Sequence, residues 1–208
     1  MPPAGYTQEL RRFDRWSRTY DGSLLQLFLF RRVHQAVLNL VAQRTEPKVL
    51  LDVGCGTGRL LRAARVRWPN AEFTGVDPSL GMIEMARRLT TGATFLNGFA
   101  ENLPLADSSV DVVLSTISFH HWQDHGAGVR EVARVLRPGG YFFLTDLVWP
   151  AWVSLFSNHH TAPPPARISL LFTEAGLHIL MQQALTWHFT LVTVGQRTAR
   201  ESITPETG

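Results

Sequence analysis

The sequence predicts an α/β fold, a doubly wound and mostly parallel sheet of seven strands with an antiparallel C-terminal edge. From about residue 46 onward, short apolar stretches typical of strands alternate with helical stretches, which favours parallel strands joined by helices. A glycine-rich loop directly follows the first apolar stretch. The last two apolar stretches lie too close together for a helical crossover, so they predict an antiparallel pair. A sheet of this kind binds ligands at the carboxyl ends of its strands.

The expected elements follow the apolar pattern and its interruptions. The expected strands are 49–53, 72–76, 94–96, 110–115, 141–145, 177–185 and 189–194, and the expected helices are 59–67, 80–89, 127–136 and 166–175. Ser79 is placed to cap the second of these helices. The Arg-Pro-Gly-Gly sequence 137–140 is expected to close the third helix.

The N-terminal residues 1–45 are expected to be helical and to help cover the active site. Residues 46–208 are expected to form the core, and the 208 residues suffice for one structural domain with a buried centre. Apolar runs are interrupted within about twenty residues, so no transmembrane segment is predicted. The single cysteine, Cys55, excludes an internal disulfide and predicts a cytoplasmic protein.

The net charge is +3, and arginines cluster near the N-terminus, as a nucleic-acid or anionic-membrane surface would require. The aromatic residues among them, Phe13, Trp16 and Tyr20, recur at helical spacing and are not arranged for base stacking. We therefore interpret it as the solvated faces of helices and expect no nucleic-acid partner.

The glycine-rich loop reads Asp52-Val53-Gly54-Cys55-Gly56-Thr57-Gly58. Glycine at every second position lets the backbone turn tightly and approach a ligand closely. Asp77 ends the next strand about twenty residues later, where a carboxylate can accept both hydroxyls of a ribose. This pattern alone leaves a dinucleotide and S-adenosylmethionine as candidate ligands.

The spacing of the glycines discriminates between the two ligands. The dinucleotide motif is G-x-G-x-x-G, whereas this loop has G-x-G-x-G preceded by Asp52. A carboxylate there would repel a pyrophosphate but would suit the ammonium and sulfonium groups of S-adenosylmethionine. A nicotinamide-dependent oxidoreductase is therefore disfavoured.

Six ordered motifs extend the pattern from Phe13 to Val194. They are Phe13-Asp14-Arg15 with Tyr20-Asp21, the loop 51–58, Gly75-Val76-Asp77-Pro78-Ser79 with Met82, Ala100-Glu101-Asn102-Leu103-Pro104, Val110-Asp111-Val112-Val113 with His120-His121, and Leu136-Arg137-Pro138-Gly139-Gly140. With these motifs the sequence resembles the class I S-adenosylmethionine-dependent methyltransferases of the small-molecule type. The resemblance is to the group typified by ubiquinone and menaquinone biosynthesis enzymes, and it implies a Rossmann-like sheet.

The resemblance also implies a cofactor site, with S-adenosylhomocysteine as the product. In such a site the glycines line the methionine part, Asp52 reaches the amino group, and Asp77 holds the ribose. Pro78 and Met82 would flank the adenine, Ala100 would face its edge, Ser115 would approach the methionine end, and Tyr20 would close over the cofactor. The residues assigned to the cofactor are Tyr20, Asp52, Gly54, Cys55, Gly56, Gly58, Asp77, Pro78, Met82, Phe99, Ala100, Glu101 and Ser115.

Phe99 departs from the pattern of the family. Many relatives carry an acid at this position, where it bonds the adenine amino group. A phenyl ring cannot accept that hydrogen bond, although it can pack against adenine. We expect S-adenosylmethionine to bind still, with Glu101 as a residue that could compensate.

The histidines supply candidate catalytic groups. His120 and His121 follow the fourth strand at the predicted ligand edge, where either could act as a general base or serve only in packing. His125, at the start of a helix, is expected to face solvent. No metal is predicted, because no ordered ligand spacing joins the histidines.

The segment 149–165 holds Trp149, Trp152, Phe156 and three consecutive prolines, and it predicts either an aromatic wall for an acceptor or a packed connector. The expected reaction is in-line transfer of a methyl group to a small-molecule acceptor, apolar or aromatic, with alignment as the main contribution of the protein. A cofactor-binding regulatory module without activity and an RNA methyltransferase remain the alternatives.

Overall fold

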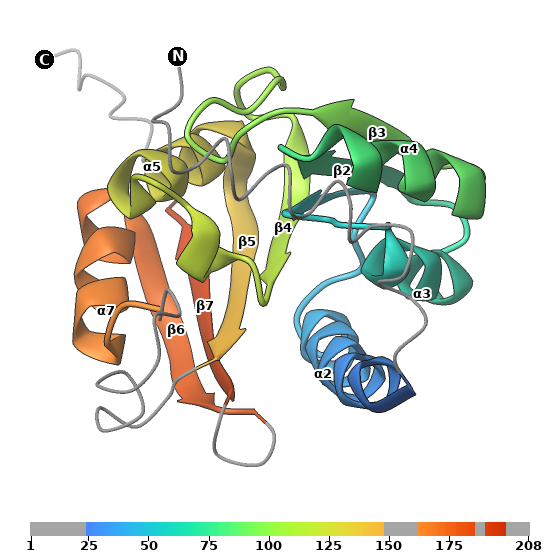
Figure 1. Ribbon diagram of the computed structural model, residues 1–208. Coiled ribbons are helices and arrows are strands. Elements are labelled where there is room, and N and C mark those ends of the chain that lie inside the picture. Colours follow the sequence, from blue (N-terminus) through green and yellow to red (C-terminus); the bar gives the residue numbers. More distant parts are fainter. Residues whose placement is uncertain (1–23, 148–161, 186–189, 199–208) are drawn as a thin grey trace, which may run out of the picture.

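The structure is a computed structural model that describes residues 24–147, 162–185 and 190–198 (Figure 1). Its seven strands form one sheet in the order β3-β2-β1-β4-β5-β7-β6. The strands are β1 (Val49–Val53), β2 (Glu72–Asp77), β3 (Thr94–Asn97), β4 (Val110–Thr116), β5 (Leu136–Leu147), β6 (Leu177–Ala184) and β7 (Thr190–Arg197). The first five are parallel to one another, and β7 lies antiparallel to both β5 and β6. The predicted sheet, with its antiparallel C-terminal edge, is confirmed.

The helices cover both faces of the sheet (Figure 1). They are α2 (Leu24–Ala42), α3 (Arg59–Arg67), α4 (Leu80–Leu89), the 3-10 turn η2 (Phe119–His121), α5 (His125–Val135) and α7 (Pro165–Glu174). Successive strand residues point to opposite faces, so Phe142 packs with α5 and α7 while Phe143 packs with α2, α3 and α4. Val37 of α2 shares this second core with the strands. The N-terminal helix therefore packs on the sheet and has no core of its own in the described part.

Helix α5 differs from its predicted bounds. It begins at His125, because the Asp124 side chain caps it by accepting a hydrogen bond from the Ala127 backbone N–H at 2.9 Å. It ends at Val135, and the Arg-Pro-Gly-Gly sequence belongs to the irregular start of β5. The expectation that this sequence closes the helix was wrong, because Leu136 already pairs with Val110 of β4.

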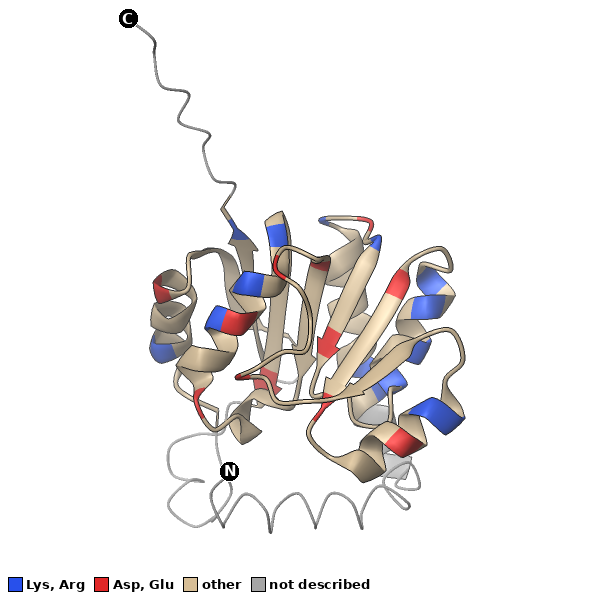
Figure 2. Ribbon diagram, turned by 90° about the horizontal axis from the view of Figure 1, so that it is seen from above, with Lys and Arg blue, Asp and Glu red and all other residues tan. Residues whose placement is uncertain are grey.

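Several acidic residues lie at strand ends, whereas most of the basic residues lie on the helices (Figure 2). Asp77 ends β2, and Asp146 is the last residue but one of β5. The ends of these parallel strands meet at one edge of the sheet, so this edge gathers carboxylates. No helix in residues 24–147 or 162–185 is long and apolar enough to cross a membrane.

Candidate cofactor and acceptor site

The glycine loop between β1 and α3 adopts backbone angles that side chains disfavour. Gly54, Gly56 and Gly58 have φ values of 76°, 51° and 76°. A Cβ on Gly54 would lie 2.3 Å from the Ser118 hydroxyl oxygen, so no side chain fits there. A Cβ on Gly56 would meet nothing within 4 Å. The loop is therefore packed tightly on one side and open at Gly56, where a ligand could contact the backbone.

Asp77 connects the end of β2 to this loop. Its Oδ2 accepts a hydrogen bond from the Gly56 backbone N–H at 2.9 Å, and its Oδ1 accepts one from the Ser79 backbone N–H at 2.9 Å. Ser79 in turn caps α4, as predicted, by accepting a hydrogen bond from the Met82 N–H at 3.2 Å. Asp77 is only 9% exposed. Its carboxylate is thus held in a fixed position beside the loop.

Asp52 lies beneath the loop and is almost fully buried. Burial, together with the nearby Asp77 carboxylate, raises the pKa of Asp52 to about 8. A cation beside Asp52 would favour its ionised form, and the ammonium group of S-adenosylmethionine is such a cation. Burial likewise raises the pKa of the Cys55 thiol, so Cys55 is an unreactive part of the loop.

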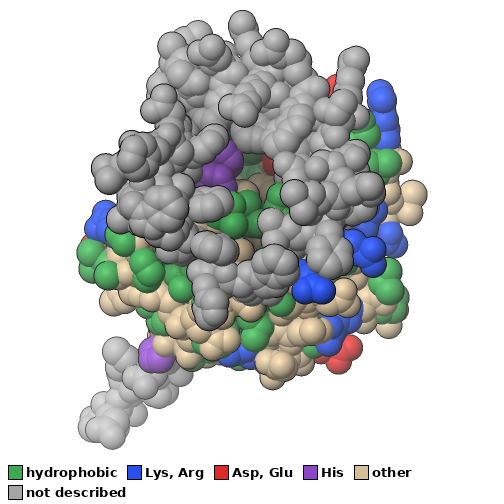
Figure 3. Space-filling model, turned by 60° about the horizontal axis from the view of Figure 1, so that its bottom comes forward, with side chains coloured by type: hydrophobic (Ala, Val, Ile, Leu, Met, Phe, Trp, Pro, Cys, Tyr) green, Lys and Arg blue, Asp and Glu red, His purple; other side chains and the backbone are tan. Residues whose placement is uncertain are grey.

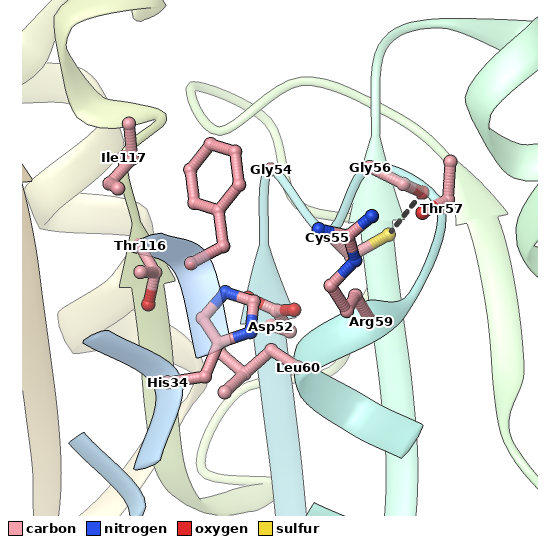
Figure 4. A pocket seen from close by; sticks show the side chains of 11 residues that line it. His34, Asp52, Gly54, Cys55, Gly56, Thr57, Arg59, Leu60, Thr116 and Ile117 are labelled. Carbon is pink, nitrogen blue, oxygen red and sulfur yellow. Dashed lines mark hydrogen bonds between the residues drawn. The ribbon is translucent and has the colours of Figure 1, made fainter. Parts of the chain in front are cut away.

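A small pocket of about 60 Å³ opens beside Asp52 (Figure 4). Its walls come from the glycine loop, the end of β4, and helices α2 and α3; the lining residues are Phe30, His34, Asp52, Gly54, Cys55, Gly56, Thr57, Arg59, Leu60, Thr116 and Ile117. Whole-ligand pockets usually exceed roughly 300 Å³, so this one suits only a small part of a ligand, such as an amino-acid end.

Sequence reasoning missed His34 and Arg59 of this pocket. His34 of α2 points toward Asp52, and Arg59 begins α3 on the other side (Figure 4). Burial and the charges of Arg59 and Arg62 lower the pKa of His34 to about 4, so its imidazole is neutral. A guanidinium and a carboxylate in one pocket offer partners for the two charged groups of an amino acid.

The residues predicted to face adenine lie in the segments that follow β2 and β3. Met82 and Ala100 are buried, whereas Pro78, Phe99 and Glu101 are partly exposed. They follow the ends of β2 and β3, so the structure brings them to the predicted edge.

Glu101 supports the loop between η2 and α5. Its Oε1 accepts hydrogen bonds from the backbone N–H groups of Gln123 at 2.7 Å and Asp124 at 3.2 Å. This use of the carboxylate argues against the expectation that Glu101 compensates for Phe99.

Ser115 is not at the pocket surface. It is fully buried, and its hydroxyl lies 2.8 Å from that of Ser118, which donates to the Val53 carbonyl at 3.0 Å. The next residue, Thr116, lines the pocket instead, and its buried hydroxyl has no hydrogen-bond partner among the described residues. Thr116 rather than Ser115 faces this pocket because alternate strand residues point to opposite faces, and the role expected of Ser115 at the methionine end stays a prediction. Tyr20 lies outside the described residues.

The three histidines after β4 have different surroundings. His120 Nδ1 lies 2.8 Å from the Oδ1 of Asp146, a buried partner that sequence reasoning missed. The His121 ring packs against that of His120, with centroids 4.0 Å apart. His125 is partly buried, and its Nε2 lies 3.0 Å from the Phe119 carbonyl. The expectation that His125 faces solvent was wrong, because its ring packs on Phe119.

Several predictions concern residues outside the described ranges. These are Trp149, Trp152 and Phe156 of the aromatic segment, and the four N-terminal arginines before residue 24. Among the described residues, no cluster of three or more His, Cys, Asp or Glu could hold a metal ion.

A glycine loop after β1, a fixed acid at the end of β2 and the sheet order together define the class of Rossmann-like methyltransferases. Residues 51–144 match a family model described as a methyltransferase domain. The chain is 31% identical over 143 residues to a demethylmenaquinone methyltransferase of Thermotoga maritima, covering 68% of this chain and 62% of that protein. Residues 51–144 of the chain therefore correspond to a methyltransferase domain.

Other relatives agree with this family. A malonyl-acyl-carrier-protein O-methyltransferase of Dechloromonas aromatica is 33% identical over 175 residues, which cover 79% of this chain and 63% of the relative. The methyltransferase chain in the solved complex with the Haloferax volcanii Trm112 activator is 25% identical, with a TM-score of 0.75, covering 89% of this chain and 97% of that one. The chain thus spans less than two thirds of the length of these two curated relatives.

Proposed function

We propose that this protein transfers a methyl group from S-adenosylmethionine to a small-molecule acceptor. The observation that carries the proposal is the Asp77 carboxylate, which is buried and bonded to the Gly56 N–H beside a pocket floored by Asp52. Two buried acids and an open loop backbone suit a cationic ligand that also carries ribose hydroxyls. When bound, S-adenosylmethionine would supply the activated methyl group.

The residues of the chain would hold this cofactor in three parts. Asp52, Arg59 and the glycine loop would take the amino-acid end, and Asp77 would take the ribose. The adenine would lie against Pro78, Met82, Phe99 and Ala100. Each of these roles remains a prediction, supported by the common edge at which the structure brings the residues together.

The protein would act mainly by alignment. An acceptor held in line with the methyl group reacts in an effectively unimolecular step, which can lower the barrier by roughly 7–11 kcal/mol at best. Histidine and hydrophobic side chains are visible on the face shown in Figure 3. A face of this composition suits an acceptor with an apolar or aromatic body. We place the protein in the cytoplasm on the basis of its single cysteine.

The experiment that tests the proposal measures formation of S-adenosylhomocysteine with a panel of apolar acceptors, including quinols, phenols and aromatic acids. We expect product with at least one acceptor and none from the Asp77→Ala variant. Binding of the cofactor without turnover of any acceptor would favour the cofactor-binding regulatory module. Transfer to RNA alone would favour an RNA methyltransferase.

A further inference from the structure

His120 and Asp146 lie at the carboxyl ends of the neighbouring strands β4 and β5. Thr116 of β4 pairs with Thr145 of β5, so the segments that follow these residues leave the sheet side by side. His120 belongs to η2, and its Nδ1 lies 2.8 Å from the Oδ1 of Asp146. The Asp146 side chain is 2% exposed and that of His120 is 13% exposed. The pair is therefore mostly buried, with the imidazole nearer to the surface.

The hydrogen bonds of Asp146 determine which ring nitrogen of His120 carries a proton. Asp146 Oδ2 accepts from the His120 backbone N–H at 2.9 Å, and Oδ1 accepts from the Leu147 backbone N–H at 2.7 Å. Backbone N–H groups can only donate, so both carboxylate oxygens are acceptors. An ionised carboxylate offers only lone pairs to Nδ1, which must therefore be the protonated nitrogen. Nε2 of the neutral ring is then the nitrogen with a free lone pair.

The Nε2 atom is available for a substrate. Within the described residues it has no hydrogen-bond partner, whereas the corresponding atom of His125 lies 3.0 Å from the Phe119 carbonyl. The His121 ring packs on His120 with its centroid 4.0 Å away and limits its rotation. A buried carboxylate thus orients His120 through Nδ1 and leaves Nε2 facing away from Asp146.

We propose that His120 is the general base of this protein, that Asp146 is its positioning residue, and that the acceptor is a hydroxyl compound. This assignment rests on the proposed methyl transfer and deepens it. In the step, the acceptor O–H gives its proton to His120 Nε2, and the acceptor oxygen forms a bond to the methyl carbon. The carbon–sulfur bond breaks with its electron pair left on sulfur. The imidazolium then releases its proton to water.

A hydroxyl is the acceptor group that needs such a base. A phenol has a pKa near 10 and stays protonated at neutral pH, whereas a carboxylic acid with a pKa of about 4 is already ionised. General base catalysis typically contributes about 10²–10⁴-fold to the rate. A carboxylate acceptor would gain nothing from the base. The pair of His120 and Asp146 therefore favours methyl transfer to phenols and enols over transfer to aromatic acids.

The first test reads the protonation of His120 directly and needs no substrate. Nitrogen-15 NMR of histidine-labelled protein should show the Nδ1–H tautomer for neutral His120. In Asp146→Asn the single amide oxygen cannot serve both backbone N–H groups, so we expect the Nδ1–H population to fall. His178→Asn, a change at an exposed residue of β6, should leave the His120 signals unchanged. An Nε2–H tautomer in the wild-type protein would overturn the proposal.

The second test compares naphthol with naphthoate as acceptors of the same ring size. We expect transfer to naphthol, a loss of 10²-fold or more in kcat for His120→Asn, and an unchanged Kd for S-adenosylhomocysteine. Absence of transfer to naphthol, or an equal rate in the variant, would overturn the proposal. Failure of the wild-type protein to bind S-adenosylhomocysteine would instead count against the proposed function. The NMR test of the His120 tautomer does not depend on that binding.

Discussion

The Asp77 carboxylate accepts a hydrogen bond from the Gly56 backbone N–H at 2.9 Å and so connects the end of β2 to the glycine loop after β1. The two residues are 21 positions apart in the sequence. Gly56 is also the loop glycine whose Cβ direction is open. The same carboxylate would thus shape the loop and contact the ribose of a bound cofactor.

Replacing Asp77 with Asn should weaken cofactor binding. The amide has one acceptor oxygen in place of two and no charge, so it cannot accept from both Gly56 and Ser79 and also from a ribose. Hydrogen bonds to charged groups contribute about 1.5–3 kcal/mol, which predicts a rise of roughly 10- to 100-fold in the Kd for S-adenosylhomocysteine. Isothermal titration calorimetry measures this Kd.

Asp111→Asn is the matched control for this change. Asp111 bonds Arg137 and the Val49 N–H, near the start of β4 and far from the carboxyl ends of the strands. The control should lower the melting temperature but leave the Kd unchanged. Equal Kd values for the two variants would show that Asp77 has no role in the binding site.

Two glycine variants distinguish the effect of backbone strain on stability from the effect of a new side chain on ligand binding. Gly56 and Gly139 both have positive φ values, 51° and 82°, and a Cβ on either would meet nothing within 4 Å. Each change to Ala should therefore lower the free energy of unfolding by a similar amount, about 1–2 kcal/mol. Only Gly56→Ala should weaken binding of S-adenosylhomocysteine, because its methyl group would enter the ligand space. Unchanged affinity in Gly56→Ala would place the ligand elsewhere.

The raised pKa of Asp52 predicts an unusual pH dependence of stability. The folded-state pKa of about 8 exceeds the unfolded value of about 3.9, so between these values the folded protein binds one more proton than the unfolded chain. The ligand-free protein should therefore lose stability as the pH rises from about 4 to 8, by up to about 1.4 kcal/mol per pH unit from this group. Chemical denaturation of the wild-type protein and Asp52→Asn across this range measures the effect. The same slope in both proteins would contradict it.

The missing acid at Phe99 can be restored. In Phe99→Asp the new carboxylate could accept from the adenine amino group, and we expect the affinity for S-adenosylhomocysteine to rise by about tenfold. S-inosylhomocysteine, which lacks that amino group, should not gain. Glu101→Gln should change neither affinity by much, because its carboxylate bonds the backbone at Gln123. Unchanged affinity in Phe99→Asp would show that the missing acid is unimportant.

The fold could be predicted from the sequence because each strand has its own local signal. The glycine loop, Asp77 and the histidines after β4 were expected at one edge, since all of them follow strand ends. The start of α5 could not be predicted in the same way. It depends on the Asp124 cap, and Leu136 looks helical in sequence but pairs with Val110 across the sheet.

The partners within the site were the part that sequence could not reveal. His120 and Asp146 are 26 residues apart, and nothing in either segment signals the other. His34 lies in a mostly apolar helix, and nothing in the neighbouring sequence distinguishes a binding histidine there from a packing one. Arg59 follows the glycine loop, but in the sequence it cannot be told apart from an arginine on the exposed face of a helix. These contacts arise only when β1, β4 and β5 are packed side by side.

The most direct test of the cofactor site is parallel calorimetric titration of the purified protein with S-adenosylmethionine, S-adenosylhomocysteine and NADH. We predict binding of both adenosyl compounds, weakened in Asp77→Asn and Gly56→Ala, and no binding of NADH. Binding of NADH alone, or adenosyl binding that neither variant weakens, would contradict the site described for Asp52, Asp77 and the glycine loop.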